Sequence, residues 1–396
     1  MYIVGIDIAK RNHEAVVMDD QGKVVRKAFS FANNTEGFEK FLSILTGISQ
    51  DASGFIIGME STSHYWLALF SALKRQGYNV QVLNPIQSNA LRGLYIRQVK
   101  NDQRDSFIIA DVIRFGRYTQ GQTPSDDLFA LRELCRARVF LVNMAADTKK
   151  KVIALLDQVF PEYETIFSDI FGLTSTDLLL ECATPEEILA IETDKLVAIL
   201  ENASRKRYRL PKALQIKEIA QNSFGVILAS DTFSLLIKQH VEHVRFIERQ
   251  IADIEAKIIE LFSHFDTCIT TIPGIGPILG ATIFSEIGDI SRFSSSAKLA
   301  AFAGIDPTVK QSGEFTGTHN HMSKRGSPYL RRALWQAAVL SVTCNPSLKA
   351  FHQKKVAEGK PRKNSLGHVT RKLTNIIFAV LRDNQPYVPR AMPLAE

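Results

Sequence analysis

Four acidic residues in the first quarter of the chain have the types and order of a site for hard divalent cations. Asp7 lies inside one apolar, strand-like run, and Glu60 ends another. Asp102 and Asp105 are three residues apart and therefore share one face of a predicted helix. A carboxylate in a buried strand is costly unless it is paired or binds a metal. Together the four acids predict a cage for Mg²⁺, with Mn²⁺ as a substitute, of the kind used in phosphoryl transfer.

The helical pair of acids has a simpler explanation when taken alone, because acids in a first helical turn suit the helix dipole. The two strand acids favour the metal site, since a core strand is expected to carry apolar residues at their positions. Lys10 follows Asp7 closely, where its ammonium group can contact a phosphate. Asp111, two turns after Asp105, is a candidate for a spare ligand.

The elements that must position these acids follow from the apolar pattern. Residues 2–9, 14–19 and 24–31 predict three short strands joined by turns. After them we expect a helix over 35–45, a strand over 54–60, a helix over 64–76, a strand over 79–83 and helical material to about 118. Three antiparallel strands followed by alternating strands and helices is the order of a ribonuclease-H-like domain. The sequence thus predicts an α/β, ribonuclease-H-like catalytic domain over 1–125.

The next region, 126–265, is predicted to be mostly helical. Thr184 followed by Pro185 has the pattern of a capped helix start. From Ile237 to Leu261, apolar residues recur in steps of three and four with charges between them. This predicts a coiled coil over about 235–262 that joins two copies of the chain. The alternative is a single amphipathic helix packed on its own domain.

The last region, 266–396, is predicted to be a helical domain with a Gly-Pro turn, then a basic helix from about 347 and a Pro-containing tail. Gly274 and Gly276 lie in that turn between helices. We expect a helix-hairpin-helix element whose backbone amides approach a DNA phosphate. The alternative is a plain tight turn between packed helices.

Basic residues gather in this last region and favour contacts with nucleic-acid phosphates. The candidates are Lys324, Arg325, Arg331, Arg332, Lys354, Lys355, Arg362, Lys363, Arg371 and Lys372. The alternative is a solvated helix face. Ser312, beside Gly313 in a predicted mobile loop, is a possible nucleophile, but spacing alone does not separate it from Ser323 and Ser327.

Composition narrows the class of protein. The 396 residues are 45% hydrophobic and 22% charged, with a net charge of +7, which fits a folded protein with a polyanionic partner. No apolar run approaches the roughly 20 residues that span a bilayer, and no signal peptide is expected. The four cysteines have no paired spacing, which argues against a zinc site or disulfides. We therefore expect a cytoplasmic protein without a membrane partner.

In motif order and spacing, nearly the whole chain resembles the DEDD transposases of bacterial insertion sequences, also called bridge-RNA-guided recombinases. The N-terminal motifs are Gly5-Ile6-Asp7-Ile8-Ala9-Lys10, Met59-Glu60-Ser61-Thr62, Val82-Leu83-Asn84-Pro85 and Lys100-Asn101-Asp102-Gln103-Arg104-Asp105. The C-terminal motifs are Ile272-Pro273-Gly274-Ile275-Gly276, Phe302-Ala303-Gly304, Ser312-Gly313 and Ser323-Lys324-Arg325-Gly326. The segment from about 155 to 235 is longer than in compact members.

The resemblance implies a resolvase-like N-terminal domain in which Asp7, Glu60, Asp102 and Asp105 bind magnesium. It implies a C-terminal transposase domain whose nucleophile matches Ser312, which becomes covalently joined to a DNA phosphate. It also implies a composite site with halves from different subunits, assembled as dimers that pair into a tetramer. A structured bridge RNA from the element's non-coding end is implied to pair with donor and target DNA.

Three other classes of protein compete with this interpretation. A Holliday-junction-resolvase-like nuclease that hydrolyses DNA with water needs the four acids but not Ser312. A sugar kinase or ATPase begins with a similar strand, but the Gly-rich phosphate loops are absent from the sequence. A non-catalytic nucleic-acid-binding protein is disfavoured, because strand carboxylates without a metal would repel phosphate.

Overall fold

The computed structural model describes residues 1–61, 64–83, 102–116, 125–308, 311–312, 315–316 and 321–389, with only the backbone at 102–103, 311–312 and 315–316. The chain divides into two compact units, Met1–Thr123 and Pro124–Glu396, and each is described by itself. The predictions of helix over 84–101 and of a tail after 389 lie outside the described residues.

The first unit is built on a five-stranded sheet in the order β3-β2-β1-β4-β5. Its elements are β1 (Tyr2–Asp7), β2 (Asn12–Asp19), β3 (Val24–Ala32), α1 (Thr35–Ile48), η1 (Ala52–Gly54), β4 (Phe55–Glu60), α2 (Trp66–Arg75), β5 (Asn79–Leu83) and α4 (Asp102–Arg114). β1 is antiparallel to β2 and parallel to β4, and β5 is parallel to β4. The predicted order of strands and helices is confirmed, as is the mixed, ribonuclease-H-like sheet.

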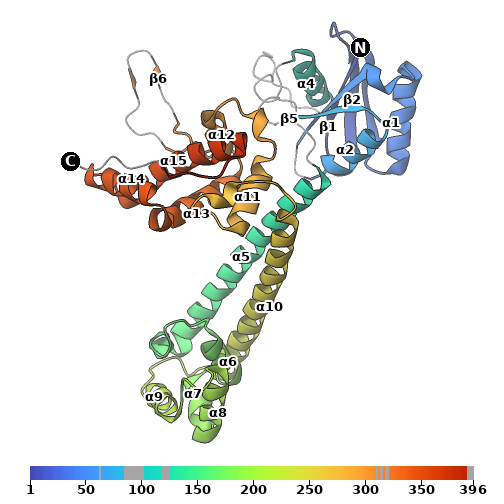
Figure 1. Cartoon of the computed structure of the whole chain (residues 1–396). Coiled ribbons are helices and arrows are strands. Elements are labelled where there is room, and N and C mark those ends of the chain that lie inside the picture. Colours follow the sequence, from blue (N-terminus) through green and yellow to red (C-terminus); the bar gives the residue numbers. More distant parts are fainter. Residues whose placement is uncertain are drawn as a thin grey trace, which may run out of the picture. The chain divides into compact units, whose positions relative to one another are not determined.

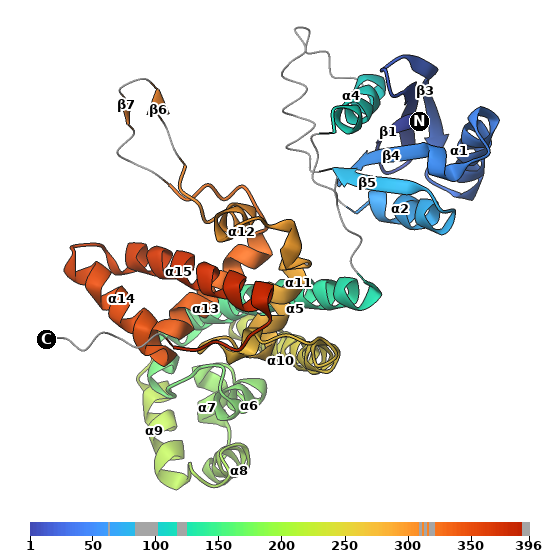
Figure 2. The ribbon, with the colours of Figure 1, turned by 45° about the horizontal axis from the view of Figure 1, so that its top comes forward.

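Helices cover both faces of this sheet (Figures 1 and 2). Residues alternate between the faces along β1: Val4 and Ile6 pack with α1 and α2, while Ile3 packs with α4. Gly5 also lies on the α4 side, where a Cβ atom would be only 2.0 Å from the Ser106 carbonyl oxygen. The glycine therefore allows α4 to lie directly against the central strand.

The second unit contains two long antiparallel helices, α5 (Asp126–Val159) and α10 (Ser230–Phe262), which pack along each other (Figures 1 and 2). The predicted seam is real, and Ile237, Val244 and Ile258 are buried in it. Its partner is α5 of the same chain. The alternative of a helix packed within its own domain is what the structure has, because α5 covers this seam.

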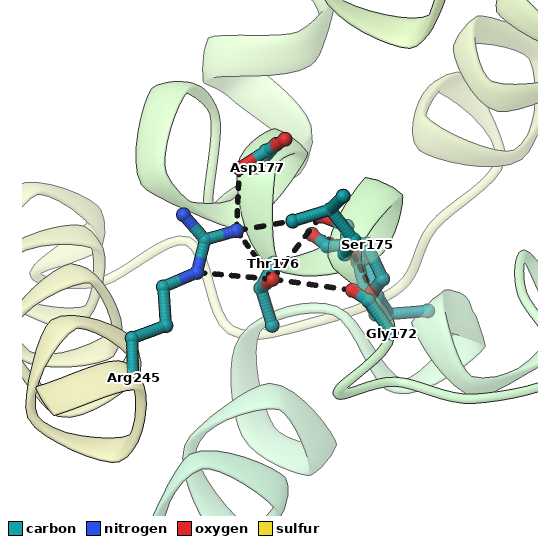
Figure 3. A network of polar contacts seen from close by, with 7 residues as sticks. Gly172, Ser175, Thr176, Asp177 and Arg245 are labelled. Carbon is teal, nitrogen blue, oxygen red and sulfur yellow. Dashed lines mark hydrogen bonds and ion pairs between the residues drawn. The ribbon is translucent and has the colours of Figure 1, made fainter. Parts of the chain in front are cut away.

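A small helical cluster closes one end of this pair. Its elements are η2 (Pro161–Thr165), α6 (Leu173–Glu181), α7 (Pro185–Ala190), α8 (Thr193–Ala203) and α9 (Leu210–Gln221). As predicted, Thr184 caps α7, accepting a hydrogen bond from the Glu187 amide at 3.4 Å. Arg245 of α10 reaches α6, donating to the Thr176 hydroxyl and pairing with Asp177 (Figure 3). This contact ties α10 to its own chain.

The C-terminal helices share one apolar core with the other end of the α5–α10 pair. The elements are η3 (Ile269–Thr271), α11 (Pro277–Ile287), η4 (Ile290–Arg292), α12 (Ser296–Ala303), β6 (Gln311–Ser312), β7 (Phe315–Thr316), α13 (Pro328–Cys344), α14 (Pro346–Ala357) and α15 (Arg362–Asp383). The single basic helix that we expected is two helices, α14 and α15. Gly359, at φ +81°, and Pro361 end one helix before the next begins.

Within the described parts of the chain, no helix is both long enough and apolar enough to cross a membrane.

Candidate functional site

Asp7 and Glu60 lie side by side at the carboxyl ends of two adjacent parallel strands. Ile6 of β1 is opposite Met59 of β4, so the register places the next residue of each strand, Asp7 and Glu60, beside each other. Both side chains are half-buried. The strand pairing brings together two acids that are far apart in the sequence.

Both of these acids face α4. Each follows, by two residues, a glycine on which α4 packs: a Cβ atom on Gly5 would be 2.0 Å from Ser106 O, and one on Gly58 would be 2.6 Å from Ile113 Cγ1. Because side chains two residues apart in a strand project to the same face, Asp7 and Glu60 point to the α4 side of the sheet.

The first turn of α4 lies at the same end of the sheet as these acids. Ser106 lies over Gly5, whereas Arg114 reaches Gly22, which follows β2 in the turn to β3. Since β2 is antiparallel to β1, that turn marks the amino end of β1. The helix therefore begins at the carboxyl end of β1, and Asp105, only 8% exposed, is in this first turn with the backbone of Asp102.

The donor set fits a hard cation in type, because it consists of carboxylates from two strand ends and one helix start. No group of three or more acids, histidines or cysteines close enough to hold an ion is formed by the described side chains. The fourth predicted ligand is Asp102, whose side chain lies outside the described part of the chain. Lys10 is exposed just after β1, and its phosphate contact stays a prediction.

The structure gives Asp111 a different role from the spare ligand that we considered. Its Oδ1 atom is 2.8 Å from Nε of Arg114, and the residue is 4% exposed. Six residues separate it from Asp105, which is about 9 Å along a helix axis. Asp111 therefore holds Arg114 near the other end of the sheet.

A cleft of about 1540 Å³ lies between α13, α15 and the base of the β6–β7 hairpin. The cations among its lining residues are Lys324, Arg331, Arg332, Lys360, Lys363 and Arg371. The described residues that line it include no carboxylate. Trp335 and His368 add ring surfaces. Such a surface suits a phosphate backbone with exposed bases.

Two of the cleft arginines are held in place by the surrounding structure. Arg331 donates from Nη1 to the Ala303 carbonyl at 3.2 Å, and Arg332 donates from Nη1 to Asn143 Oδ1 at 2.6 Å. The cleft gathers five of the predicted contacts: Lys324, Arg331, Arg332, Lys363 and Arg371. The predicted contacts Arg325, Lys354, Lys355, Arg362 and Lys372 are not among its lining residues.

Sequence reasoning missed Trp335 in this cleft, whereas Lys360 belongs to the basic segment 349–372 for which phosphate contacts are predicted. Trp335 follows Arg331 by four residues on α13 and so shares its helix face, which is a signal that the sequence contains. Lys360 lies in the break between α14 and α15, which we had expected to be continuous helix.

Ser312 belongs to a short antiparallel hairpin rather than to the loop that we expected. It pairs with Phe315 at the end of β6, and the Pro307–Met322 bridge closes the base of the same arm. Pro307, Met322 and Lys324 also line the cationic cleft. The hairpin that carries Ser312 therefore starts at the edge of that cleft.

The competing serines have structural bonds. The Ser323 hydroxyl donates to Asp306, and the Ser327 hydroxyl donates to Glu286 Oε2 at 2.7 Å while it caps α13. These bonds give both hydroxyls a structural role, and the part of Ser312 as nucleophile stays a prediction.

Gly274 packs against α13. It has φ +97°, and a Cβ atom would be 2.6 Å from the Ser341 amide nitrogen of α13. Ser341 in turn donates to the Pro273 carbonyl at 2.8 Å. Gly274 thus forms a tight turn between packed elements, and its phosphate contact stays a prediction. Gly276 precedes α11 with open space around it, and a phosphate contact there stays a prediction.

A mixed five-stranded sheet with acids at its central strand ends, followed by a mainly helical unit with a cationic cleft, is the arrangement of a DEDD-type transposase. Family models support this class. Residues 4–161 match the DEDD transposase domain of the IS110 type, and residues 266–353 match the domain described as transposase IS116/IS110/IS902 family. The chain belongs to the IS110 family of DEDD transposases, enzymes that cleave and rejoin DNA strands and whose domain implies use of a divalent metal.

Similar proteins extend along nearly the whole chain. A 44.8 kDa uncharacterized protein of insertion element IS116 from Streptomyces clavuligerus is 24% identical over 391 residues, covering 98% of this chain and 96% of the relative. The pilin gene-inverting protein of Moraxella bovis is 24% identical, covering 98% of each chain. The transposase for insertion sequence element IS1111A of Coxiella burnetii is 21% identical, covering 97% of this chain and 91% of the relative.

Proposed function

We propose that this transposase is guided by a structured non-coding RNA and recombines donor and target DNA through a covalent phosphoserine at Ser312. Mg²⁺, or Mn²⁺ in its place, would be bound by Asp7, Glu60, Asp102 and Asp105. The observation that carries the proposal is the gathering of acids from β1, β4 and α4 at one end of the sheet. The proposed covalent bond between Ser312 and DNA is supported by a second observation: the hairpin that carries Ser312 starts at a cationic cleft.

The chemistry divides between the acids and the serine. When bound, a divalent cation would neutralise charge on the scissile phosphate and orient it. The Ser312 hydroxyl would attack the phosphorus, a bond from phosphorus to Ser312 Oγ would form, and a strand hydroxyl would leave. The same strand, or an exchanged one, would then attack the serine ester. The ester conserves the phosphodiester energy, so rejoining needs no external energy source.

The cleft residues would hold nucleic acid without reading its sequence. Lys324, Arg331 and Arg371 carry charges that suit phosphates, while base pairing with the RNA would choose the sites. We further propose action in the cytoplasm on the nucleoid, as dimers that form a tetramer on two DNAs. The division into functional domains at 1–125, 126–265 and 266–396 stays part of the proposal.

A second candidate is a resolvase-like nuclease that hydrolyses with water, because the acid cluster alone supports it. The two mechanisms differ in one product. Attack by Ser312 leaves protein joined to DNA, and attack by water leaves two free ends.

The test is a denaturing gel with labelled DNA ends, guide RNA, Mg²⁺ and full-length protein. We expect a denaturation-resistant adduct in wild type and in Ser323→Ala, and none in Ser312→Ala or Asp7→Asn. Ser323→Ala is the matched control, since its hydroxyl is bonded to Asp306. Cleavage without any adduct in wild type would favour the hydrolytic mechanism. An adduct in Ser312→Ala would exclude Ser312 as the nucleophile.

A further inference from the structure

An apolar pocket lies beside the cationic cleft in the C-terminal unit. It has a volume of about 400 Å³, a size at which pockets commonly hold small organic groups. Its described lining is mostly apolar and comes from α11 and α13: Ile278, Leu279, Trp335, Val339 and Leu340. Gln336 adds an amide. Trp335 and Gln336 also line the cationic cleft, so the pocket and the cleft meet at these two residues.

One face of α13 joins the two hollows. Arg331, Trp335 and Val339 follow one another in steps of four residues, and the residue after each of them continues a second row. Residues four apart lie on one helix face, about 6 Å apart along the axis. The face therefore runs from two cations, past an indole ring and an amide, to two apolar side chains. A single strand whose phosphates contact the arginines can place a base over Trp335, one helical turn further along.

Trp335 differs from the other tryptophan of the chain in its surroundings. Trp66 packs against Phe70, with ring centroids 5.4 Å apart. In the part of the chain that the structure describes, no ring lies against Trp335, and neither its indole N–H nor the Gln336 amide makes a hydrogen bond. Val339 and Leu340 beside them are 42% and 47% exposed. An unpaired nucleobase needs this combination, because it stacks on an aromatic ring and forms hydrogen bonds along its edge.

Charge favours a nucleobase over a second copy of the chain as the occupant of the pocket. The described residues of the adjoining cleft carry cations and no carboxylate. The chain itself has a net charge of +7, so a second copy seated here would on average bring more positive charge to this surface. A base enters together with its phosphate, which is negative, and the apolar walls exclude water from its ring.

We propose that this pocket is a subsite for an unpaired nucleobase of a strand held in the cationic cleft, with Trp335 as its stacking surface. The inference rests on the proposed nucleic-acid role of the cleft and deepens it. The cleft holds the backbone, and the pocket holds a base that has left its stack. Stacking accepts every base, so the subsite favours single strands without selecting a sequence. DNA and RNA share this chemistry, and the test therefore uses both.

The test measures binding of full-length protein to labelled single strands of about 12 nucleotides, a usual site size for such surfaces. The strands are thymidine DNA, uridine RNA and an abasic DNA strand of equal length. We expect wild type to bind at least one base-bearing strand more tightly than the abasic strand. Trp335→Ala should weaken binding of that base-bearing strand about tenfold. It should leave the affinity for the abasic strand and the salt dependence unchanged, because it removes no charge.

Three further variants make the outcome decisive. Val339→Gln keeps the indole and should weaken binding of the same base-bearing strand alone, and it decides the question if Trp335→Ala does not fold. Phe246→Ala removes an exposed ring of α10 that does not line the pocket and should behave as wild type. Arg371→Ala removes a cleft cation and should weaken binding of every strand.

Equal losses for base-bearing and abasic strands in Trp335→Ala would overturn the inference. Wild-type affinity in Trp335→Ala, with weakened binding in Arg371→Ala, would overturn the base subsite alone. Wild-type affinity in both variants would overturn the nucleic-acid role of the cleft as well. Mass photometry of the protein without nucleic acid completes the test. A lower oligomeric state of Trp335→Ala would assign the pocket to a contact between copies and also overturn the inference.

Discussion

Arg136 of α5 donates from Nε to Glu286 of α11 at 2.6 Å, and the side chain of Glu286 is only 2% exposed. The second carboxylate oxygen of Glu286 accepts from the Ser327 hydroxyl at 2.7 Å. Ser327 caps α13, the helix that carries Arg331 and Arg332. A single buried carboxylate thus joins α5 and α11 and fixes where the basic helix begins.

We expect Glu286→Ala to lower the free energy of unfolding by about 2–3 kcal/mol, because it removes the charged hydrogen bonds from the partly exposed Arg136 guanidinium and from the Ser327 hydroxyl. Glu133→Ala is the matched control. Glu133 also faces Arg136, but at 3.7 Å with 54% of its side chain exposed, so its loss should cost less than about 1 kcal/mol. Urea unfolding of the two variants measures the difference, and equal losses would contradict the assignment.

The acid end of the sheet was predictable because local patterns encode it. Strand alternation and turns located β1 and β4, and the helical spacing located Asp105.

Other features were beyond the sequence for physical reasons. The heptad pattern of α10 shows an apolar face, but a pattern does not say whether another chain or α5 will cover it. The pairing of Arg136 with Glu286 joins residues 150 apart in the chain, and no spacing rule connects them. The break at Gly359 did have a signal, a glycine followed by Pro361, which the run of basic residues obscured.

Asp105 and Asp111 should respond oppositely to removal of their charge. Asp105→Asn is expected to lower DNA cleavage about 10³-fold or more, because metal-held charge stabilisation is worth several kcal/mol, with little change in unfolding temperature. Asp111→Asn should destabilise the protein, since it breaks the bond to Arg114 Nε, while cleavage per folded molecule is kept. Cleavage assays paired with circular dichroism melts would show this. If the Asp111→Asn variant is folded but does not cleave DNA, Asp111 is a metal ligand.

Glu187 should make the α6–α9 cluster sensitive to acid. Burial raises the pKa of Glu187, but hydrogen bonds from Lys238 and Ser234, both at 2.7 Å, and from the Ala183 amide outweigh it and lower the pKa below its ordinary value of 4.5. A lowered folded-state pKa means that the stabilisation is present above pH 4.5 and is lost as the pH falls through the folded-state value.

We therefore expect Glu187→Gln to be less stable than wild type by about 2 kcal/mol at pH 7, and the difference to shrink steadily below pH 4.5. Urea unfolding at a series of pH values gives the comparison. Glu186→Gln, at the exposed neighbouring position, should show a smaller difference at neutral pH. A stability gap for Glu187→Gln that persists unchanged at pH 3 would refute the role of its charge.

The cationic cleft predicts a difference among basic residues that look alike in sequence. Lys363→Ala and Arg371→Ala each remove a charge from the cleft, so each should weaken DNA binding. The slope of the logarithm of the binding constant against the logarithm of the salt concentration should become shallower by about 0.9. Lys354 is exposed on α14 and does not line the cleft, so Lys354→Ala should change neither. Binding isotherms at several salt concentrations test this, and an equal effect at Lys354 would assign the nucleic acid to a wider surface.

Mixing two inactive variants tests whether one active site takes its acids from one subunit and Ser312 from another. Asp7→Asn keeps the serine and Ser312→Ala keeps the acids. If each site takes its acids from one subunit and its serine from another, a mixed dimer contains one intact site, and the adduct must form on the Asp7→Asn chain. Random pairing into symmetric dimers gives about a quarter of the wild-type adduct. A size tag on one variant identifies the labelled chain on a denaturing gel.

Mixing Asp7→Asn with Glu60→Gln should restore nothing, because every site then lacks one acid. Absence of adduct from the first mixture, with both variants folded and bound to DNA, would mean that acids and serine act within one chain.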